Sequence, residues 1–424
     1  MFFDPAGNAQ GRLLPPAIPA SFFGLALVMH VLAWVVLGIG AEAVVVFAGG
    51  LGLPLAALHM VTLGVLAMTA MGAAYQLLPV ATKRSVLSVA ICRASFWSFA
   101  PGVVILVYGF AMGAVWPMSI GGGLAVVGLL LFSVIIIDNL LHVKDMPVVS
   151  SHVWLSMGGL VGVAILGMIL IGDFVHGGVI DHGAFALAHL IMAGFGFMGV
   201  LTLGFSYILV PMFVLGPAAP KSIGMKSAGL AAGGLALGVF GALVRSDGML
   251  AMAALAGLGA AFLHLYGMSL TLKKRMKKIL DGGFLLIRLG WVGLILALLL
   301  GLMLIFGVPI PGGLGLFGFV MVFGWLLTFM TGVLPRIMPF LASMHAMRPG
   351  GRSPLLSKLT ADKPLKLHRY AHMVAIVSTA IGIVYDWPWL VRGGAACGTL
   401  GALAMLYFGI EVLRRTRIQI AAVV

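Results

Sequence analysis

Charged residues are scarce in this chain. Only 8% of its 424 residues are Asp, Glu, Lys or Arg, whereas 62% are hydrophobic. A soluble domain has too little interior to hide that much apolar surface, so the composition excludes a water-soluble enzyme and indicates an integral membrane protein. Cysteine is nearly absent: Cys92 and Cys397 lie far apart and follow no metal-binding or redox spacing, which argues against a disulfide framework. Phosphate-binding loops, dinucleotide fingerprints and nucleophile elbows are also missing from the sequence.

Long apolar segments are plentiful. A helix needs about 20 residues to cross a hydrocarbon core of ~30 Å, and twelve segments meet this length. The sequence therefore predicts an all-α integral membrane fold with twelve transmembrane helices, at about 22–41, 54–80, 92–113, 120–142, 151–172, 184–213, 225–244, 248–271, 283–307, 312–341, 369–386 and 389–412.

The distribution of basic residues predicts the orientation in the membrane. The chain carries a net charge of +14, and in this twelve-span reading nearly all loop Lys and Arg residues fall on one side. Only Arg245 and Arg392 lie in loops on the other side. Cytoplasmic loops carry the excess of Lys and Arg, so both termini are expected in the cytoplasm. The basic runs then serve as topology signals and lipid-headgroup contacts, not as a nucleic-acid surface.

One spacing pattern occurs three times, about 130 residues apart. It consists of Gly, seven residues, Gly, six residues and Pro, in the copies Gly64/Gly72/Pro79, Gly196/Gly204/Pro211 and Gly324/Gly332/Pro339. The copies fall in the second, sixth and tenth spans. A single membrane domain of residues 1–424 is therefore predicted to contain three pseudo-symmetric four-helix units, at about 22–142, 151–271 and 283–412, with a cytoplasmic loop at 342–368. Glycines eight apart make a flat strip that a second helix or a flat ligand can approach.

The first two copies carry polar residues that the third copy lacks. A Tyr follows the second Gly by three residues, and a His lies near the start of the span: Tyr75 with His59, and Tyr207 with His189. The third copy has Pro335 at the Tyr place and Phe317 and Phe319 at the His places. A neutral imidazole in hydrocarbon needs a partner for each nitrogen, and a bound metal supplies one. The two histidines are thus either ligands in a common space or unrelated interfacial residues bonded to loop carbonyls.

Other histidines offer further candidates. Asp173, His176, Asp181 and His182 precede His189 and could hold a divalent metal or copper, although their loose spacing favours a solvated loop. His30 lies in the middle of the first span, where an ionisable residue suggests a function by default.

Three cytoplasmic-side histidines are expected to be less relevant. His152 follows two serines and suggests a helix cap. His368 and His372 are one helical turn apart, a spacing that can bind metal. The neighbouring basic residues disfavour a bound cation there: Lys363, Lys366 and Arg369.

The topology and one helical segment resemble a known protein family. Twelve helices, cytoplasmic termini, three four-helix units and an outer His at the start of the second helix resemble subunit I of the haem-copper oxidase superfamily, including its nitric oxide reductase branch. The stretch from His59 through Met71–Pro79 is similar to that family's second helix, whose His is an axial ligand of low-spin haem. The resemblance implies that role for His59.

The chain also departs from the family. Its tenth helix, about 312–341, has no His, and neither has the seventh, about 227–243, so the family's complete haem–copper centre cannot be assembled. The chain looks like a short, divergent member, comparable to NnrS-type haem proteins linked to nitric oxide tolerance.

The resemblance implies a b-type haem protein of the bacterial inner membrane, with an electron-transfer or NO- or O2-related redox function. If it is an enzyme, an oxidoreductase is expected, with a periplasmic electron donor or partner subunit. Haem b would lie between the second and sixth spans, ligated by His59 and His189, with room left by Gly64, Gly72, Gly196 and Gly204. Copper is a second candidate cofactor, with His30, His176 and His182 as candidate ligands. A transporter or metal-handling permease without haem, or an accessory subunit that lost its cofactor, remains the alternative.

Overall fold

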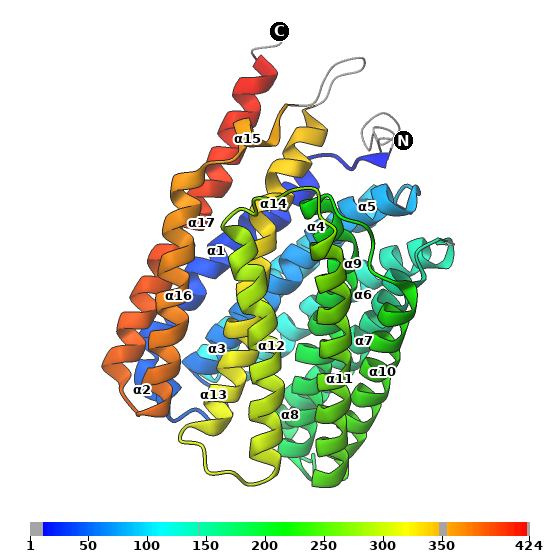
Figure 1. The fold of residues 1–424 in the computed structure, drawn as a ribbon. Coiled ribbons are helices and arrows are strands. Elements are labelled where there is room, and N and C mark those ends of the chain that lie inside the picture. The colour runs from blue at the N-terminus through cyan, green and yellow to red at the C-terminus, as the bar shows by residue number, and fades with distance from the viewer. Residues whose placement is uncertain (1–11, 144, 347–353, 422–424) are drawn as a thin grey trace.

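The computed structural model describes residues 12–143, 145–346 and 354–421, and the described part is helical without strands. Within these ranges, twelve continuous helical stretches are long and apolar enough to cross a membrane. This confirms the prediction of an all-α membrane fold with twelve candidate spans (Figure 1). Part of the expected cytoplasmic loop, residues 347–353, lies outside the described residues.

Nine of the spans are single α-helices. They are α1 (Ala17–Ile39), α5 (Val89–Met112), α6 (Val115–Leu141), α7 (Pro147–His176), α10 (Lys221–Leu243), α11 (Asp247–Lys273), α12 (Gly283–Ile305), α16 (Asp362–Val384) and α17 (Pro388–Ala421). Two short helices, α2 (Ala41–Val45) and α15 (Leu356–Leu359), lie in connections.

The three spans that carry the repeated glycine pattern share a further feature. Each is interrupted by a π-helical segment, giving α3–η2–α4 (Leu53–His59, Met60–Ala67, Met68–Thr82), α8–η3–α9 (His182–Leu190, Ile191–Gly199, Val200–Val214) and α13–η4–α14 (Gly313–Phe319, Val320–Leu327, Thr328–His345). The first glycine of each copy, Gly64, Gly196 or Gly324, lies inside the π segment. Such segments are rare and frequently occur at functional sites.

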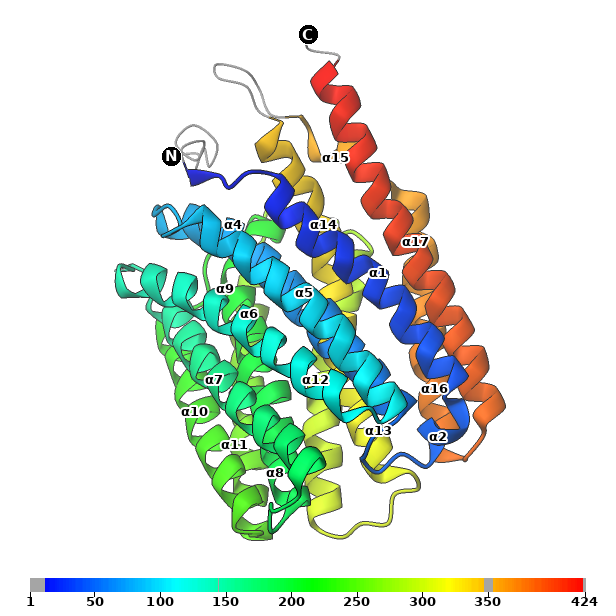
Figure 2. The same ribbon diagram turned by 180° about the vertical axis from the view of Figure 1, so that it is seen from behind.

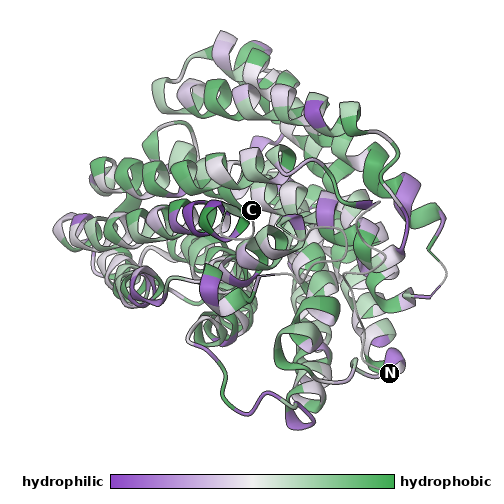
Figure 3. Ribbon diagram, turned by 90° about the horizontal axis from the view of Figure 1, so that it is seen from above, coloured by the Kyte–Doolittle hydropathy of each residue, from purple (hydrophilic) through white to green (hydrophobic). Residues whose placement is uncertain are grey.

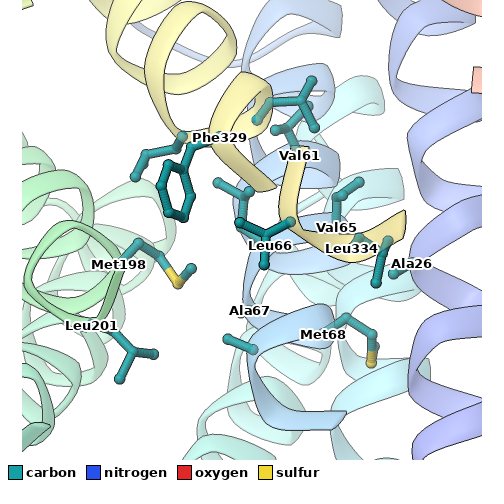
Figure 4. Close-up of a cluster of buried hydrophobic side chains, with 14 of the residues drawn as sticks. Ala26, Val61, Val65, Leu66, Ala67, Met68, Met198, Leu201, Phe329 and Leu334 are labelled. Atoms are coloured by element: carbon teal, nitrogen blue, oxygen red, sulfur yellow. The ribbon is translucent and has the colours of Figure 1, made fainter. Parts of the chain in front are cut away.

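These three spans form the centre of the bundle. In their most apolar windows 61%, 72% and 72% of the residues are buried, against 28–50% in the other spans. Segment η4 contacts both η2 and η3, and α1 packs against α17. Figure 4 shows part of this interior, where Leu66, Met198 and Phe329 come from three different central spans.

The outer helices pair with their chain neighbours: α5 with α6, α10 with α11, and α16 with α17 (Figures 1 and 2). Hydrophobic residues cover these helices (Figure 3), and large ones such as Trp97 and Trp116 are exposed. An apolar outer surface of this kind fits contact with a lipid bilayer. Both described ends of the chain lie at the same end of the bundle (Figure 1).

Candidate cofactor cavity and buried histidine groups

A cavity of about 800 Å³ lies among the three central spans. Its lining is mostly apolar and includes Phe195, Phe317 and Trp325. It reaches the loops at the end of the bundle opposite the described chain ends, where Arg245 borders it. Three imidazoles also line it: His182 near the loops, and His59 and His189. The structure therefore brings the two repeat-related histidines to a common space.

His59 is held in one orientation by its own helix. It is the last residue of α3, and its Nδ1 lies 3.0 Å from the carbonyl oxygen of Leu55. A carbonyl only accepts, so Nδ1 carries the proton and Nε2 keeps its lone pair. The ring rests against Phe110 at a centroid distance of 4.7 Å. This arrangement leaves one nitrogen of His59 available to a ligand.

His189 faces the cavity from α8. Its ring lies close to Gly167 of α7, where an added Cβ would approach Cε1 to 3.2 Å. Its Nδ1 is buried and has no hydrogen-bond partner. A buried ring nitrogen without a partner is costly, so this atom is a candidate for contact with a bound group.

The third central span contributes aromatic rings where the other two contribute imidazoles. Phe317 and Phe319 both line the cavity, and Phe319 stacks on Phe323 at a centroid distance of 5.0 Å. The wall formed by α13 and η4 is therefore apolar, and the ligand-type nitrogens of the cavity come from the first two copies of the pattern.

The glycine strips serve helix packing. A Cβ added at Gly64 or Gly72 would meet Met29 or Phe22 of α1, at 2.9 and 2.7 Å. A Cβ added at Gly204 would meet His152 of α7 at 2.7 Å.

Gly196 lies beside Gly159 of α7 and does not line the cavity. The expectation that these strips make room for a macrocycle therefore needs correction, because side chains and backbone of α1 and α7 occupy the space beside them.

The acidic residues around the connection between α7 and α8 are engaged in ion pairs. Asp173 Oδ2 lies 2.7 Å from His182 Nδ1, and Asp181 binds Arg245 and caps α8 by accepting from the Ala184 N–H. The Arg245 guanidinium lowers the pKa of Asp181 to about 2. His176 is exposed at the end of α7. Among the described residues no group of three or more His, Cys, Asp or Glu is arranged to hold a metal ion.

A first buried histidine group joins α1 and α16. His30, His368 and His372 are each about 1% exposed, and the ring centroids of His368 lie 5.9 Å from His30 and 5.4 Å from His372. The expectation that basic residues surround His368 and His372 is not met. Lys363 and Lys366 are exposed, whereas both imidazoles face the interior.

A second buried histidine group lies at Tyr207. The Tyr207 ring is 5.3 Å from His152 and 4.9 Å from His264 between centroids. His152 does not cap α7, as the sequence suggested, because it is fully buried and its Nδ1 donates to the Val148 carbonyl at 2.7 Å. His152 Nε2, both nitrogens of His264 and the Tyr207 hydroxyl have no hydrogen-bond partner.

Repeat offsets could have revealed this second group. Tyr75 and Tyr207 are 132 residues apart, and so are Phe132 and His264. Phe132 packs on Tyr75 at 5.4 Å, as His264 packs on Tyr207. The repeated glycine pattern marks only the three central spans, so it gives no signal for the partner helices that carry Phe132 and His264.

Comparisons with known proteins found a similar solved structure but no matching sequence family. No protein-family model matches the chain, and no curated protein sequence matches it. A haem-copper terminal oxidase dimer solved by cryo-electron microscopy is similar in structure, with a TM-score of 0.63 over 95% of this chain and 84% of that chain, at 13% sequence identity. The chain therefore shares the membrane fold of a haem-copper terminal oxidase.

Proposed function

We propose that this protein binds a b-type haem in the central cavity, with His59 as one axial ligand and His189 as the other. The observation that carries the proposal is the pair of repeat-related imidazoles on one apolar cavity. The fold shared with a haem-copper terminal oxidase agrees with it. So does the similarity of the His59 segment to the haem-ligating second helix of that family.

The cavity has the size and chemistry that a haem requires. Its volume of about 800 Å³ lies within the range of ~300–1,000 Å³ typical of ligand and cofactor sites, and its lining is apolar. The bond from His59 Nδ1 to Leu55 fixes the ring and its tautomer, as is usual for metal-ligating histidines. At the rim, the Arg245 guanidinium can donate hydrogen bonds to the carboxylates of a porphyrin.

This ligand set favours electron transfer in the membrane. A haem with two histidine ligands has no open position for a gas and supplies a one-electron couple. The seventh and tenth spans lack the histidines of a haem–copper centre, so oxygen or nitric oxide reduction by that route is not proposed. We place the protein in a bacterial inner membrane, where it would exchange electrons with a periplasmic donor in an NO- or O2-related process. The apolar lining suits a porphyrin better than the passage of hydrated ions, which disfavours a permease.

The test is the haem content of the purified protein. Wild-type protein expressed with a haem supply should carry about one haem b per chain by the pyridine haemochrome assay, with a Soret band. His59→Ala and His189→Ala should each lose most of that band, whereas His142→Ala, at an exposed position, should keep it. Wild-type protein that holds no haem would refute the proposal, and so would haem retained in the His59→Ala/His189→Ala double variant.

A further inference from the structure

One arginine lies on the surface of a membrane span without an acidic partner. Arg288 is exposed and lies within the candidate span Gly283–Ile305, five residues after its first residue. It forms no ion pair in the part of the chain that the structure describes, and its guanidinium carbon lies 5.3 Å from the centroid of the Phe284 ring. A charged side chain within a membrane span is costly and generally marks a functional site. The surroundings of Arg288 therefore indicate what it binds.

Two further cations lie at the first turn of α12. Arg336 of α14 also lies over the Phe284 ring, at 5.5 Å, so one aromatic ring carries two guanidinium groups. Asp281 Oδ1 lies 2.5 Å from Arg336 Nη2, and Asp281 Oδ2 lies 3.5 Å from Lys277 Nζ. Lys277, Arg288 and Arg336 form a basic cluster that shares this one carboxylate. The cluster is therefore positively charged.

An apolar stripe continues from Arg288 along the outside of α12. Its members recur at helical spacing and are each 40–54% exposed: Leu285, Val292, Leu296, Leu299 and Met303. A stripe of this kind on the outside of a membrane bundle lies against lipid chains. The five residues before Arg288 rise about 7.5 Å along the helix, and a helical side chain points back toward the helix start. The long Arg288 side chain can therefore carry its charge toward the first turn of α12, at the end of the bundle that holds both described chain ends (Figure 1).

We propose that this basic cluster binds one anionic phospholipid. The lipid phosphodiester accepts hydrogen bonds from Arg288, with Lys277 beside it, and the acyl chains follow the apolar stripe of α12. Bonds between a guanidinium and a phosphate are charge-assisted and stronger than neutral ones. A zwitterionic headgroup fits less well, because its ammonium needs a carboxylate. Asp281 already binds two cations and accepts a hydrogen bond from the Gly283 N–H.

The members of the cluster have different roles. The Arg336 side chain is only 11% exposed and also lies over the Phe213 ring at 4.8 Å, so it supplies charge from within the bundle. Arg288 and Lys277 are exposed, so they are the groups that a headgroup can reach. None of these residues lines the central cavity, so the lipid site does not depend on the proposed haem.

A second arginine supplies a matched control. Arg93 of α5 is exposed and lies four residues after Val89, the first residue of its helix. An exposed apolar stripe continues from it as well, with Trp97, Val104 and Tyr108. Within the described residues Arg93 shares neither a carboxylate nor an aromatic ring with a second cation. Arg93 therefore has a similar depth and similar apolar surroundings without the cluster.

The experiment measures lipid binding by the delipidated full-length protein in detergent. Palmitoyl-oleoyl phosphatidylglycerol is titrated, and bound lipid is counted by native mass spectrometry. Wild type and Arg93→Leu should each bind one phosphatidylglycerol per chain with equal affinity. Arg288→Leu should bind about 5-fold more weakly, and Lys277→Leu/Arg288→Leu about 30-fold more weakly, because each basic residue near an anionic headgroup contributes a factor of about 5. Phosphatidylglycerol should raise the melting temperature of wild type and Arg93→Leu more than that of Arg288→Leu.

Equal phosphatidylglycerol affinities of Arg288→Leu and wild type would overturn the proposal. An equal loss in Arg93→Leu would do the same, because it would show that any arginine on an exposed stripe attracts lipid. Phosphatidylcholine is the zwitterionic probe and glycerol 3-phosphate the probe without acyl chains. If either binds as tightly as phosphatidylglycerol, the site does not select an anionic lipid. Arg288→Gln, which removes the charge and keeps a polar side chain, serves as the second variant if Arg288→Leu melts below wild type before lipid is added.

Discussion

The repeated units differ most clearly in the residues that surround the two related tyrosines. In the first unit the Tyr75 hydroxyl bonds to Ser95 Oγ at 2.7 Å, and Phe22 and Phe132 flank its ring. In the second unit His152 and His264 flank Tyr207. The backbone position of the first flanking residue is the same, since a Cβ at Gly72 would meet Phe22 Cβ at 2.7 Å and one at Gly204 would meet His152 Cβ at 2.7 Å. The same framework therefore holds phenyl rings in one unit and imidazoles in the other.

The double substitution His152→Phe/His264→Phe should stabilise the protein. Each unpartnered polar atom in an apolar interior costs about 1–3 kcal/mol, and the first unit shows that phenyl rings fit this framework. The free energy of unfolding should rise by about 1–3 kcal/mol, measured as a higher melting temperature in detergent. The reciprocal variant Phe22→His/Phe132→His should melt lower. A large drop for His152→Phe/His264→Phe would instead mean that these imidazoles have a partner in the membrane.

Sequence reasoning reached His59 and His189 because both stand at related places in a visible repeat. It misjudged His368 and His372 because it weighed their neighbours in sequence and not their helix face. The spacing of His368, His372, Ala375 and Thr379 is that of one helical stripe, and all four are buried. Applying that periodicity would have placed both imidazoles in the interior. Their tautomers depend on Thr328 and Gly401, which no local pattern indicates.

Helical elements were predictable in number but not in detail. Twelve spans follow from apolar length alone. The last helix was expected to end near 412 and continues to Ala421, because Arg414 and Arg415 bind Glu411 within the same helix at 2.8 and 3.1 Å. The π segments had no sequence signal. At η4, the Thr328 hydroxyl bonds the Phe323 carbonyl five residues earlier, a contact that only the packed structure reveals.

The contact between α7 and η3 gives a test at the scale of elements. Gly158 and Gly159 are neighbours on α7, but a Cβ at Gly159 would lie 2.6 Å from the backbone carbon of Gly196, whereas one at Gly158 meets nothing within 4 Å. Gly159→Ala should therefore destabilise by about 1–3 kcal/mol through overpacking, and should lower haem content because η3 borders the cavity.

Gly158→Ala is the matched control for that substitution. It should be neutral or stabilising by up to about 1 kcal/mol, since alanine favours helix and the site is open. The melting temperatures of the two variants in detergent are compared to test this difference. Equal melting temperatures would show that η3 does not pack on α7 as closely as described.

At the scale of the whole molecule, ion pairs strengthen the charge asymmetry that predicts orientation. The two basic residues assigned to outer loops are both paired: Arg245 with Asp181, and Arg392 with Glu42 at 2.8 Å. The paired carboxylates therefore offset the charges of both arginines. At the opposite end of the bundle, the lysines of the run 273–278 are exposed. The positive-inside rule therefore predicts that both ends of the chain lie in the cytoplasm.

Reporter fusions test that orientation directly. With twelve spans and both described chain ends at one end of the bundle, a fluorescent protein fused after Val424 should fold and fluoresce in the cytoplasm. Alkaline phosphatase inserted after Gly178, in the loop between α7 and α8, should be active because it reaches the oxidising side. The opposite pair of results would mean that the bundle has the reverse orientation in the membrane. The cavity mouth beside Arg245 would then face the cytoplasm, and a periplasmic electron donor would have no route to the proposed haem.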